Sequence, residues 1–178
     1  MLIISKYDRG NCCRLIRNLM INLKKIICWP PLLAGVGAAV TIGILAYMTY
    51  QTELGLWLLA SFGATTVIVF GYHDNQFAQP KNVFFGHLLS AFVGILFATF
   101  FGVSFITIGL AVGIGVMLMM AFKITHPPAG GNPIIVMIGG VSFQFLIFPV
   151  MVGAIAIIIG GIIYNRLILK RKYPQTWK

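Results

Sequence analysis

Acidic side chains are scarce in this sequence. Only Asp8, Glu53 and Asp74 are acidic among its 178 residues, and they lie far apart along the chain. Hydrolytic and metal-assisted chemistry usually needs paired carboxylates or clustered ligands, and neither pattern is present. No Gly-x-Ser-x-Gly sequence occurs either. We therefore expect a protein that is not an enzyme and that carries no metal and no cofactor.

The three cysteines do not indicate a functional site either. Cys12 and Cys13 are adjacent and Cys28 is alone, so no C-x-x-C or Cys/His spacing indicates a zinc or redox site. We expect reduced thiols that face the cytoplasm or the lipid interface.

Charge is rare and is concentrated at the two ends. Only 9% of residues are charged, against about 25% in an ordinary soluble domain. Hydrophobic residues make up 59% and the mean hydropathy is +0.95. All but two of the 13 Lys and Arg lie before Trp29 or after Asn165. This pattern predicts one membrane bundle, without a second domain, whose basic flanks bind anionic lipid headgroups and no nucleic acid.

Three regions follow from this distribution. Residues 1–28 form a basic segment that lacks the short apolar core of a cleavable signal, and Arg14–Ile27 reads as an amphipathic helix on the inner membrane surface. Residues 29–168 form the transmembrane domain, and residues 169–178 form a basic cytoplasmic tail.

Six apolar stretches divide the transmembrane domain. A spanning helix needs about 20 apolar residues, which the fifth stretch does not reach. An even number of crossings with both termini in the cytoplasm keeps every Lys and Arg on the inner side, as expected in a bacterial inner membrane. The stretches are approximately Pro31–Tyr50, Leu54–Tyr72, Val83–Gly102, Ser104–Phe122, Pro128–Gly140 and Phe145–Asn165.

The string T-H-P-P-A-G-G-N-P at Thr125–Pro133 interrupts the apolar pattern. Proline lacks a backbone donor, and non-helical backbone at membrane depth survives only inside protein or beside a water-filled cavity. We predict a broken or re-entrant helix over Thr125–Gly140. The expected fold is an all-α membrane protein, a compact bundle of about four to six transmembrane segments with one or two such helices, compatible with a homo-oligomer.

A weak internal repeat has an offset of 68 residues. Gly63–Gly71 aligns with Gly131–Gly139, and three spans per copy would make the copies inverted, as in many transporters. The alternative is a chance match in apolar sequence. Small residues four apart predict close helix packing; they are Gly86, Ser90, Gly94, Ala98 and Gly102, then Gly35, Ala39 and Gly43, and finally Gly109 and Gly113.

Polar residues in or beside the apolar segments form the candidate site, because each is costly in a bilayer unless it faces the bundle interior. Short helices beginning near Pro128 or Asn132 and near Gly63–Thr66 would aim two N-termini at one place and form a seat for a small anion. The candidate substrate-binding residues are Gly63, Ala64, Thr65, Thr66, Asn82, His87, Ser90, Thr125, His126, Pro127, Pro128, Gly130, Gly131 and Asn132, and Ser61 lies nearby.

Several of these residues have a plainer reading. His126 would then cap a helix, His87 would pack in the core with one hydrogen bond, and Lys81 would reach to the inner headgroups rather than draw anions to a mouth. No acid lies inside a span. This favours a passive or His-assisted path over carboxylate-driven coupling.

The string at Thr125–Pro133 resembles the motif that names the HPP family of integral membrane proteins. Residues 61–70 and 79–94 also match the family, although Lys81 stands where Arg is expected and Gly131 and Gly71–Phe77 are less typical. The family's conserved positions fall on Gly63, Ala64, Gln79, Pro80, Asn82, Gly86, His87, Ser90, Ala91, His126, Pro127, Pro128, Ala129, Gly130, Asn132 and Pro133.

The resemblance implies about four transmembrane segments and, from plant chloroplast and cyanobacterial members, nitrite transport. Nitrite is a small monovalent anion whose oxygens accept hydrogen bonds, which suits the predicted seat. Two alternatives stay open. One is transport of another small solute such as formate, nitrate or a neutral molecule, and the other is a non-transporting membrane scaffold.

Overall fold

The computed structural model describes residues 29–51 and 58–175. The predictions for the amphipathic helix at Arg14–Ile27 and for the three cysteines lie outside these residues. The chain separates into two compact units, residues 1–33 and 34–178. The second unit contains every contact described below.

Every regular element in the described ranges is a helix, which confirms the all-α prediction. The α-helices are α2 (Trp29–Gln51), α3 (Ala60–Thr66), α4 (Pro80–Phe101), α5 (Phe105–Ala121), α6 (Asn132–Gly139) and α7 (Val152–Ile162). Turns of 3-10 helix form η2 (Gln76–Ala78) and η3 (Pro127–Gly131), and π-helical turns form η1 (Val67–Gly71), η4 (Leu146–Met151) and η5 (Ile163–Ile168).

All six predicted apolar stretches contain helix. Among the described residues, three helices are long and apolar enough to cross a membrane, namely Pro30–Gln51, Pro80–Phe101 and Leu146–Ile168. The apolar helix α5 has 17 residues, and the continuous α3–η1 helix spans only Ala60–Gly71. At about 1.5 Å per residue these helices are shorter than the roughly 30 Å of a hydrocarbon core.

The predicted break after α5 is present. The backbone turns through η3 at the two prolines and then forms the eight-residue helix α6, which ends at Gly140 in the left-handed conformation. Both pieces pack against α4, and η3 also packs against α3. The interrupted segment therefore packs against protein on the side of α3 and α4, and Pro127 is exposed on its other side.

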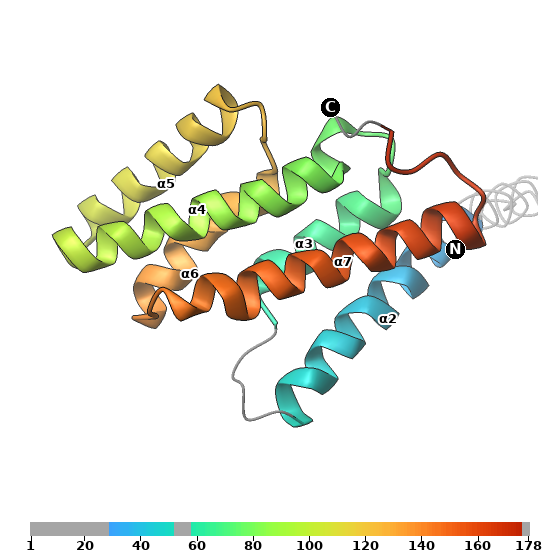
Figure 1. The fold of residues 1–178 in the computed structure, drawn as a ribbon, viewed down its shortest axis with the longest axis horizontal. Coiled ribbons are helices and arrows are strands. Elements are labelled where there is room, and N and C mark those ends of the chain that lie inside the picture. Colours follow the sequence, from blue (N-terminus) through green and yellow to red (C-terminus); the bar gives the residue numbers. More distant parts are fainter. Residues whose placement is uncertain (1–28, 52–57, 176–178) are drawn as a thin grey trace, which may run out of the picture. The chain divides into compact units, whose positions relative to one another are not determined.

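Helix α4 is the centre of this unit, and α5, α6 and α7 pack around it (Figure 1). Two glycines of α4 allow neighbouring segments to approach this helix closely. A Cβ atom on Gly94 would lie 2.6 Å from Cα of Pro133, and one on Gly86 would lie 2.7 Å from Cβ of His126. These two members of the predicted small-residue stripe thus bring α6 and the residues before η3 against α4.

The other predicted stripes are wrong. A Cβ atom added to Gly35, Gly43, Gly109 or Gly113 would have no described atom within 4 Å, and Ala39 is exposed. Packing in α2 uses Gly37 and Thr41, and packing in α5 uses Ala111 and Gly115. Small residues are frequent on every face of these helices, so four-residue spacing alone does not identify the buried face.

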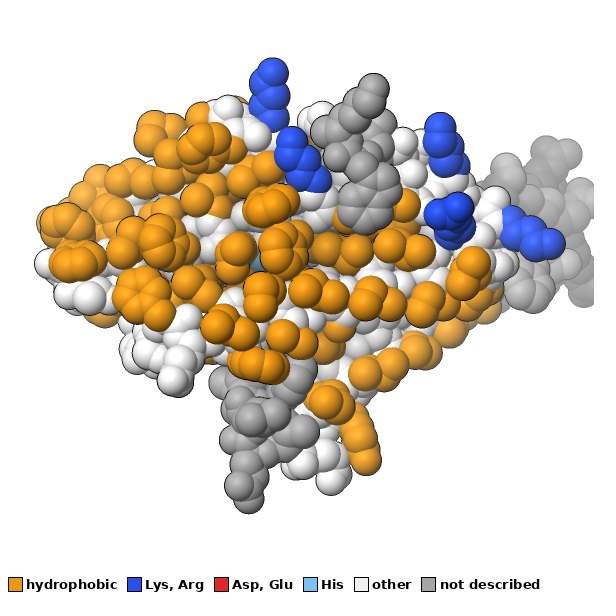
Figure 2. Space-filling model, viewed as in Figure 1, with side chains coloured by type: hydrophobic (Ala, Val, Ile, Leu, Met, Phe, Trp, Pro, Cys, Tyr) orange, Lys and Arg blue, Asp and Glu red, His pale blue; other side chains and the backbone are white. Residues whose placement is uncertain are grey.

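The basic residues that the structure describes in this unit lie at one end. Loop 72–79 is tied to the C-terminal segment, because the Tyr173 hydroxyl donates to Ala78 O at 2.8 Å and Gln175 N donates to Gln79 Oε1 at 2.7 Å. Asn82 Nδ2 donates to Thr125 O at 2.9 Å and adds the loop after α5 to this end. In Figure 2, Lys and Arg side chains gather along the upper and right-hand margins, and hydrophobic side chains cover much of the remaining face.

Candidate functional site

Six polar side chains meet inside the bundle, and we call them the polar cluster. They come from α3, α4, the residue before η3, and α6. Ser61 is 7% exposed and the others are at most 1% exposed. The members are Ser61, Thr65, His87, Ser90, His126 and Asn132.

Asn132 joins three helices. Ser61 Oγ donates to Asn132 Oδ1 at 2.7 Å, and Asn132 Nδ2 donates to Ser90 Oγ at 3.1 Å and to the backbone oxygen of His87 at 3.1 Å. The same nitrogen lies 2.9 Å from His87 Nδ1. Asn132 is the first residue of α6, and Gly131 occupies the cap position without a side-chain bond, so the Asn132 amide does not cap its own helix. The amide is used between helices instead.

The Thr65 hydroxyl lies between two imidazole rings. Its Oγ1 atom is 2.8 Å from His87 Nε2 and 3.0 Å from His126 Nε2, and it also reaches Ser61 O at 2.9 Å. The ring centroids of the two histidines are 4.9 Å apart. A single hydroxyl group thus bridges both rings.

His126 is held in place by its backbone and by its second ring nitrogen. It precedes proline and has the extended conformation that this position favours, with φ −134° and ψ 101°. Its Nδ1 atom lies 2.8 Å from the backbone oxygen of Phe77. The side chain makes no helix-capping bond. His126 thus occupies the cap position of η3 and faces a backbone carbonyl, as its plainer reading expects, but its side chain does not cap the turn.

His87 makes more polar contacts than its plainer reading expects. The ring has a polar neighbour at each nitrogen, Asn132 at Nδ1 and Thr65 at Nε2, rather than one hydrogen bond. The edge of the ring also packs against Phe62, with centroids 5.1 Å apart. This places His87 at the centre of the polar cluster.

The remaining predicted site residues lie elsewhere. Gly63 and Ala64 are exposed, and Thr66 is buried but donates to Gly63 O at 2.7 Å. Asn82 and Thr125 contact each other at the basic end. The other four, Pro127, Pro128, Gly130 and Gly131, line the turn before α6 and are exposed or partly exposed.

The prediction of two opposed helix N-termini is wrong for one of the two helices, α3. Helix α3 begins at Ala60, with Leu59 at the cap position, so Gly63–Thr66 lie within the helix and do not begin one. Two further groups take part. Ser61 is named in the sequence analysis beside the candidate residues but not among them, and the Phe77 backbone oxygen has no sequence signal.

The polar cluster is closed in this structure. Within the described ranges, the buried side-chain polar atoms that lack a partner are Tyr164 Oη and Asn165 Oδ1, and neither belongs to the cluster. Each donor of the cluster already faces an acceptor in the protein. An anion could bind here only by replacing an existing hydrogen bond.

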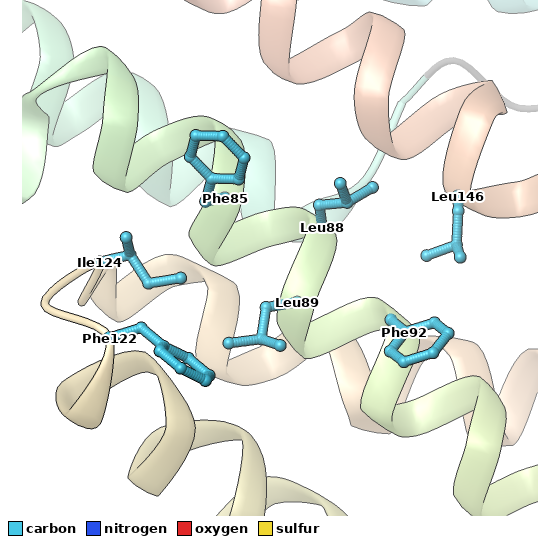
Figure 3. Close-up of a pocket in the computed structure, with 7 residues that line it drawn as sticks. All are labelled: Phe85, Leu88, Leu89, Phe92, Phe122, Ile124 and Leu146. Carbon is cyan, nitrogen blue, oxygen red and sulfur yellow. The ribbon is translucent and has the colours of Figure 1, made fainter.

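A separate pocket of about 360 Å³ lies beside α4 (Figure 3). Its lining is entirely apolar, so it offers no donor to an anion. The side chains that line it are Phe85, Leu88, Leu89, Phe92, Phe122, Ile124 and Leu146. The polar cluster remains the candidate site.

Comparison with known proteins gives the family. Residues 24–174 match the family described as HPP, transmembrane region. Two transmembrane proteins of Dictyostelium discoideum are similar, one 32% identical over 145 residues and 75% of this chain, the other 30% identical over 159 residues and 85% of this chain. The chain spans about half the length of these curated relatives, 51% of each. No solved structure matches this chain. This chain belongs to the HPP family of transmembrane proteins.

Proposed function

We propose that this protein transports a small anion across the membrane and that the polar cluster is the narrow point of its path. The observation that carries the proposal is the complete burial of two histidines, a threonine and an asparagine inside an apolar bundle. Polar groups in a membrane interior are expensive and usually belong to a substrate or ion path. A scaffold would have no need of them, so the cluster favours transport.

The chemistry of the cluster suits a weakly held anion. Hydroxyl, amide and imidazole groups donate hydrogen bonds without a fixed negative charge that would repel an anion. The absence of a fixed positive charge among the six side chains leaves the ion free to move on. Nitrite is the substrate that the family resemblance favours, and formate, nitrate or a neutral solute is the second candidate for the same uncharged site.

Opening of the closed cluster would involve the short segment formed by η3 and α6. Turn η3 and the eight-residue helix α6 carry His126 and Asn132 at their beginnings, whereas His87 and Ser90 lie on the long helix α4. Movement of the short segment away from α4 would free the Asn132 amide and the His87 ring together. An anion would then take the place of the bonds between them.

The basic end would collect the anion. Lys81, Lys123 and the residues from Arg166 to Lys172 lie at the end where loop 72–79 meets the C-terminal segment. We propose that this end faces the cytoplasm of an inner membrane, in agreement with the distribution of Lys and Arg. An anion that enters against an inside-negative potential loses about 2.3 kcal/mol per 100 mV, which a gradient or a co-transported proton must offset.

The test is anion uptake by liposomes that contain the purified protein. Nitrite, nitrate and formate are compared at equal gradients, with protein-free liposomes as the control for passive entry of the acid forms. Saturable nitrite uptake that requires the protein is expected. If none of these solutes shows protein-dependent flux, the result would contradict transport and favour the scaffold function.

A further inference from the structure

We propose that His87, Thr65 and His126 form a proton relay that couples anion movement to proton movement. The inference rests on the proposed function and deepens it, because it names the second ion. It is carried by the bridging position of Thr65 Oγ1, 2.8 Å from one Nε2 atom and 3.0 Å from the other.

The direction of the first hydrogen bonds follows from a backbone oxygen, which can only accept. The Asn132 atom that faces His87 O at 3.1 Å must therefore be the amide nitrogen. The same nitrogen, which cannot accept, faces His87 Nδ1 at 2.9 Å, so Nδ1 carries no proton and shares the two amide N–H groups with Ser90 Oγ and His87 O. In the neutral ring the proton of His87 then sits on Nε2 and points at Thr65.

The far end is fixed in the same way. His126 Nδ1 faces the Phe77 backbone oxygen at 2.8 Å, so Nδ1 carries the proton and Nε2 is the acceptor. The Thr65 hydroxyl accepts from His87 and has one proton of its own, which it gives either to Ser61 O or to His126 Nε2. In the second case all hydrogen bonds run in one direction, from Asn132 to Phe77.

A proton can pass through this chain with every bond accounted for. Once α6 moves away from α4, Asn132 no longer occupies His87 Nδ1, and a proton from water binds there while the Nε2 proton of His87 moves to Thr65 Oγ1. The original Thr65 hydroxyl proton moves to His126 Nε2, and the Nδ1 proton of His126 passes to water at loop 72–79. One proton enters and one leaves, and each N–H or O–H bond that breaks is replaced by one at the next atom.

After one passage the two ends of the relay are mismatched. His87 then presents Nδ1–H to the Asn132 amide nitrogen, and His126 presents a lone pair to the Phe77 oxygen. Both contacts are repulsive, although both are attractive in the closed cluster. Asn132 and Phe77 therefore cannot close on the rings again until the two tautomers reset, and α6 and loop 72–79 stay apart from the rings until then. Proton transfer is thereby linked to the opening that anion passage requires.

No other ionisable group is needed. The rings contact Thr65 from α3, Asn132 from α6 and the Phe77 backbone from loop 72–79, and His87 also packs against Phe62. Among these described contacts, the only titratable group next to His87 is His126, and the only one next to His126 is His87. Movement of one proton with one monovalent anion is electrically neutral, so the membrane potential would no longer oppose uptake.

The experiment measures both ions in the same liposomes. A pH-sensitive dye is enclosed with the purified protein, a nitrite gradient is applied, and a potassium gradient with valinomycin sets the membrane potential. Protein-free liposomes give the background from nitrous acid. We expect one proton per nitrite and uptake that does not change with the potential.

Substitution of the bridge isolates the relay. Thr65→Val keeps the shape of the side chain and removes the hydroxyl, and it should lower proton entry by roughly 100-fold, the lower range for positioned proton transfer. Thr65→Ser keeps the hydroxyl and should retain most of the proton entry. Elution as a single species in detergent shows whether each variant is folded.

The outcomes separate the two proposals. Protein-dependent nitrite uptake without proton entry, driven by the set potential, would overturn the relay and leave the transport function standing. Equal proton entry in folded Thr65→Val and Thr65→Ser would also overturn it. If Thr65→Val does not fold, the wild-type proton-to-nitrite ratio still decides. Lack of any protein-dependent anion flux would overturn the transport function and the coupling with it.

Discussion

Ser61 donates a 2.7 Å hydrogen bond to the side-chain oxygen of Asn132, which lies 71 positions further along the chain. This contact joins α3 to α6, the two segments that the proposed 68-residue repeat aligns. Their meeting at one buried place is what a repeat of broken helices around a site would require. The inverted symmetry itself stays a prediction.

Gly94 allows α6 to lie close to α4, and a methyl group there should be costly. The Cβ of Gly94→Ala would lie 2.6 Å from Cα of Pro133, a backbone atom that cannot turn away. We expect the variant to lose about 1–3 kcal/mol of stability. Thermal unfolding in detergent measures the loss.

Gly109→Ala is the matched control for this substitution. No described atom lies within 4 Å of its Cβ position, and it is in the interior of helix α5. Replacement of an exposed helix glycine by alanine removes a penalty of about 1 kcal/mol, so this variant should be neutral or more stable. Equal destabilisation by both variants would contradict the assigned packing of α4 against α6.

Tyr173 should make the stability of the basic end depend on alkaline pH. Burial raises the pKa of the Tyr173 hydroxyl above its usual 10.0, and the neutral hydroxyl donates to Ala78 O. A raised folded-state pKa means that stabilisation is complete below the unfolded value and declines as the pH rises above about 10. Tyr173→Phe should remove this decline and cost about 1 kcal/mol at neutral pH.

The measurement is the unfolding midpoint of wild type and Tyr173→Phe from pH 8 to 11. Tyr72→Phe is the control, because Tyr72 is 63% exposed in the same end of the unit. Identical slopes for wild type and Tyr173→Phe above pH 10 would show that this hydroxyl is not the responsible group.

The basic end should face a single side of the membrane. Lys123→Cys and Lys170→Cys are expected to react with an impermeant thiol reagent from the cytoplasmic side, and Ser142→Cys from the opposite side. The native cysteines are first replaced by serine so that the added thiol reports alone. Labelling of Lys123→Cys and Lys170→Cys from opposite sides would contradict the proposed orientation.

Local chemistry and long-range geometry differ in how well the sequence predicts them. The break at Thr125–Gly140 is predicted correctly, because missing proline donors act within the segment itself. The small-residue faces of α2 and α5 are predicted wrongly, since the buried face of a helix depends on the partner it meets. The Phe77 oxygen is missed for the same reason, and Ser61 is left outside the candidate residues although it is named beside them.

Asn132→Leu should affect both transport and folding. The leucine side chain cannot donate to Ser90 or His87 or accept from Ser61, so buried polar groups on α3 and α4 lose their partner. Each such loss costs about 1–3 kcal/mol.

If the Asn132 amide also binds the anion, loss of a charge-assisted bond of about 1.5–3 kcal/mol corresponds to roughly ten- to a hundredfold weaker binding. Nitrite uptake in liposomes, normalised to folded protein, measures the second effect. Asn82→Leu is the control, because Asn82 bonds the Thr125 backbone at the basic end and lies outside the polar cluster. Unchanged nitrite uptake by folded Asn132→Leu would remove Asn132 from the path, and an equal loss in both variants would assign the effect to general destabilisation.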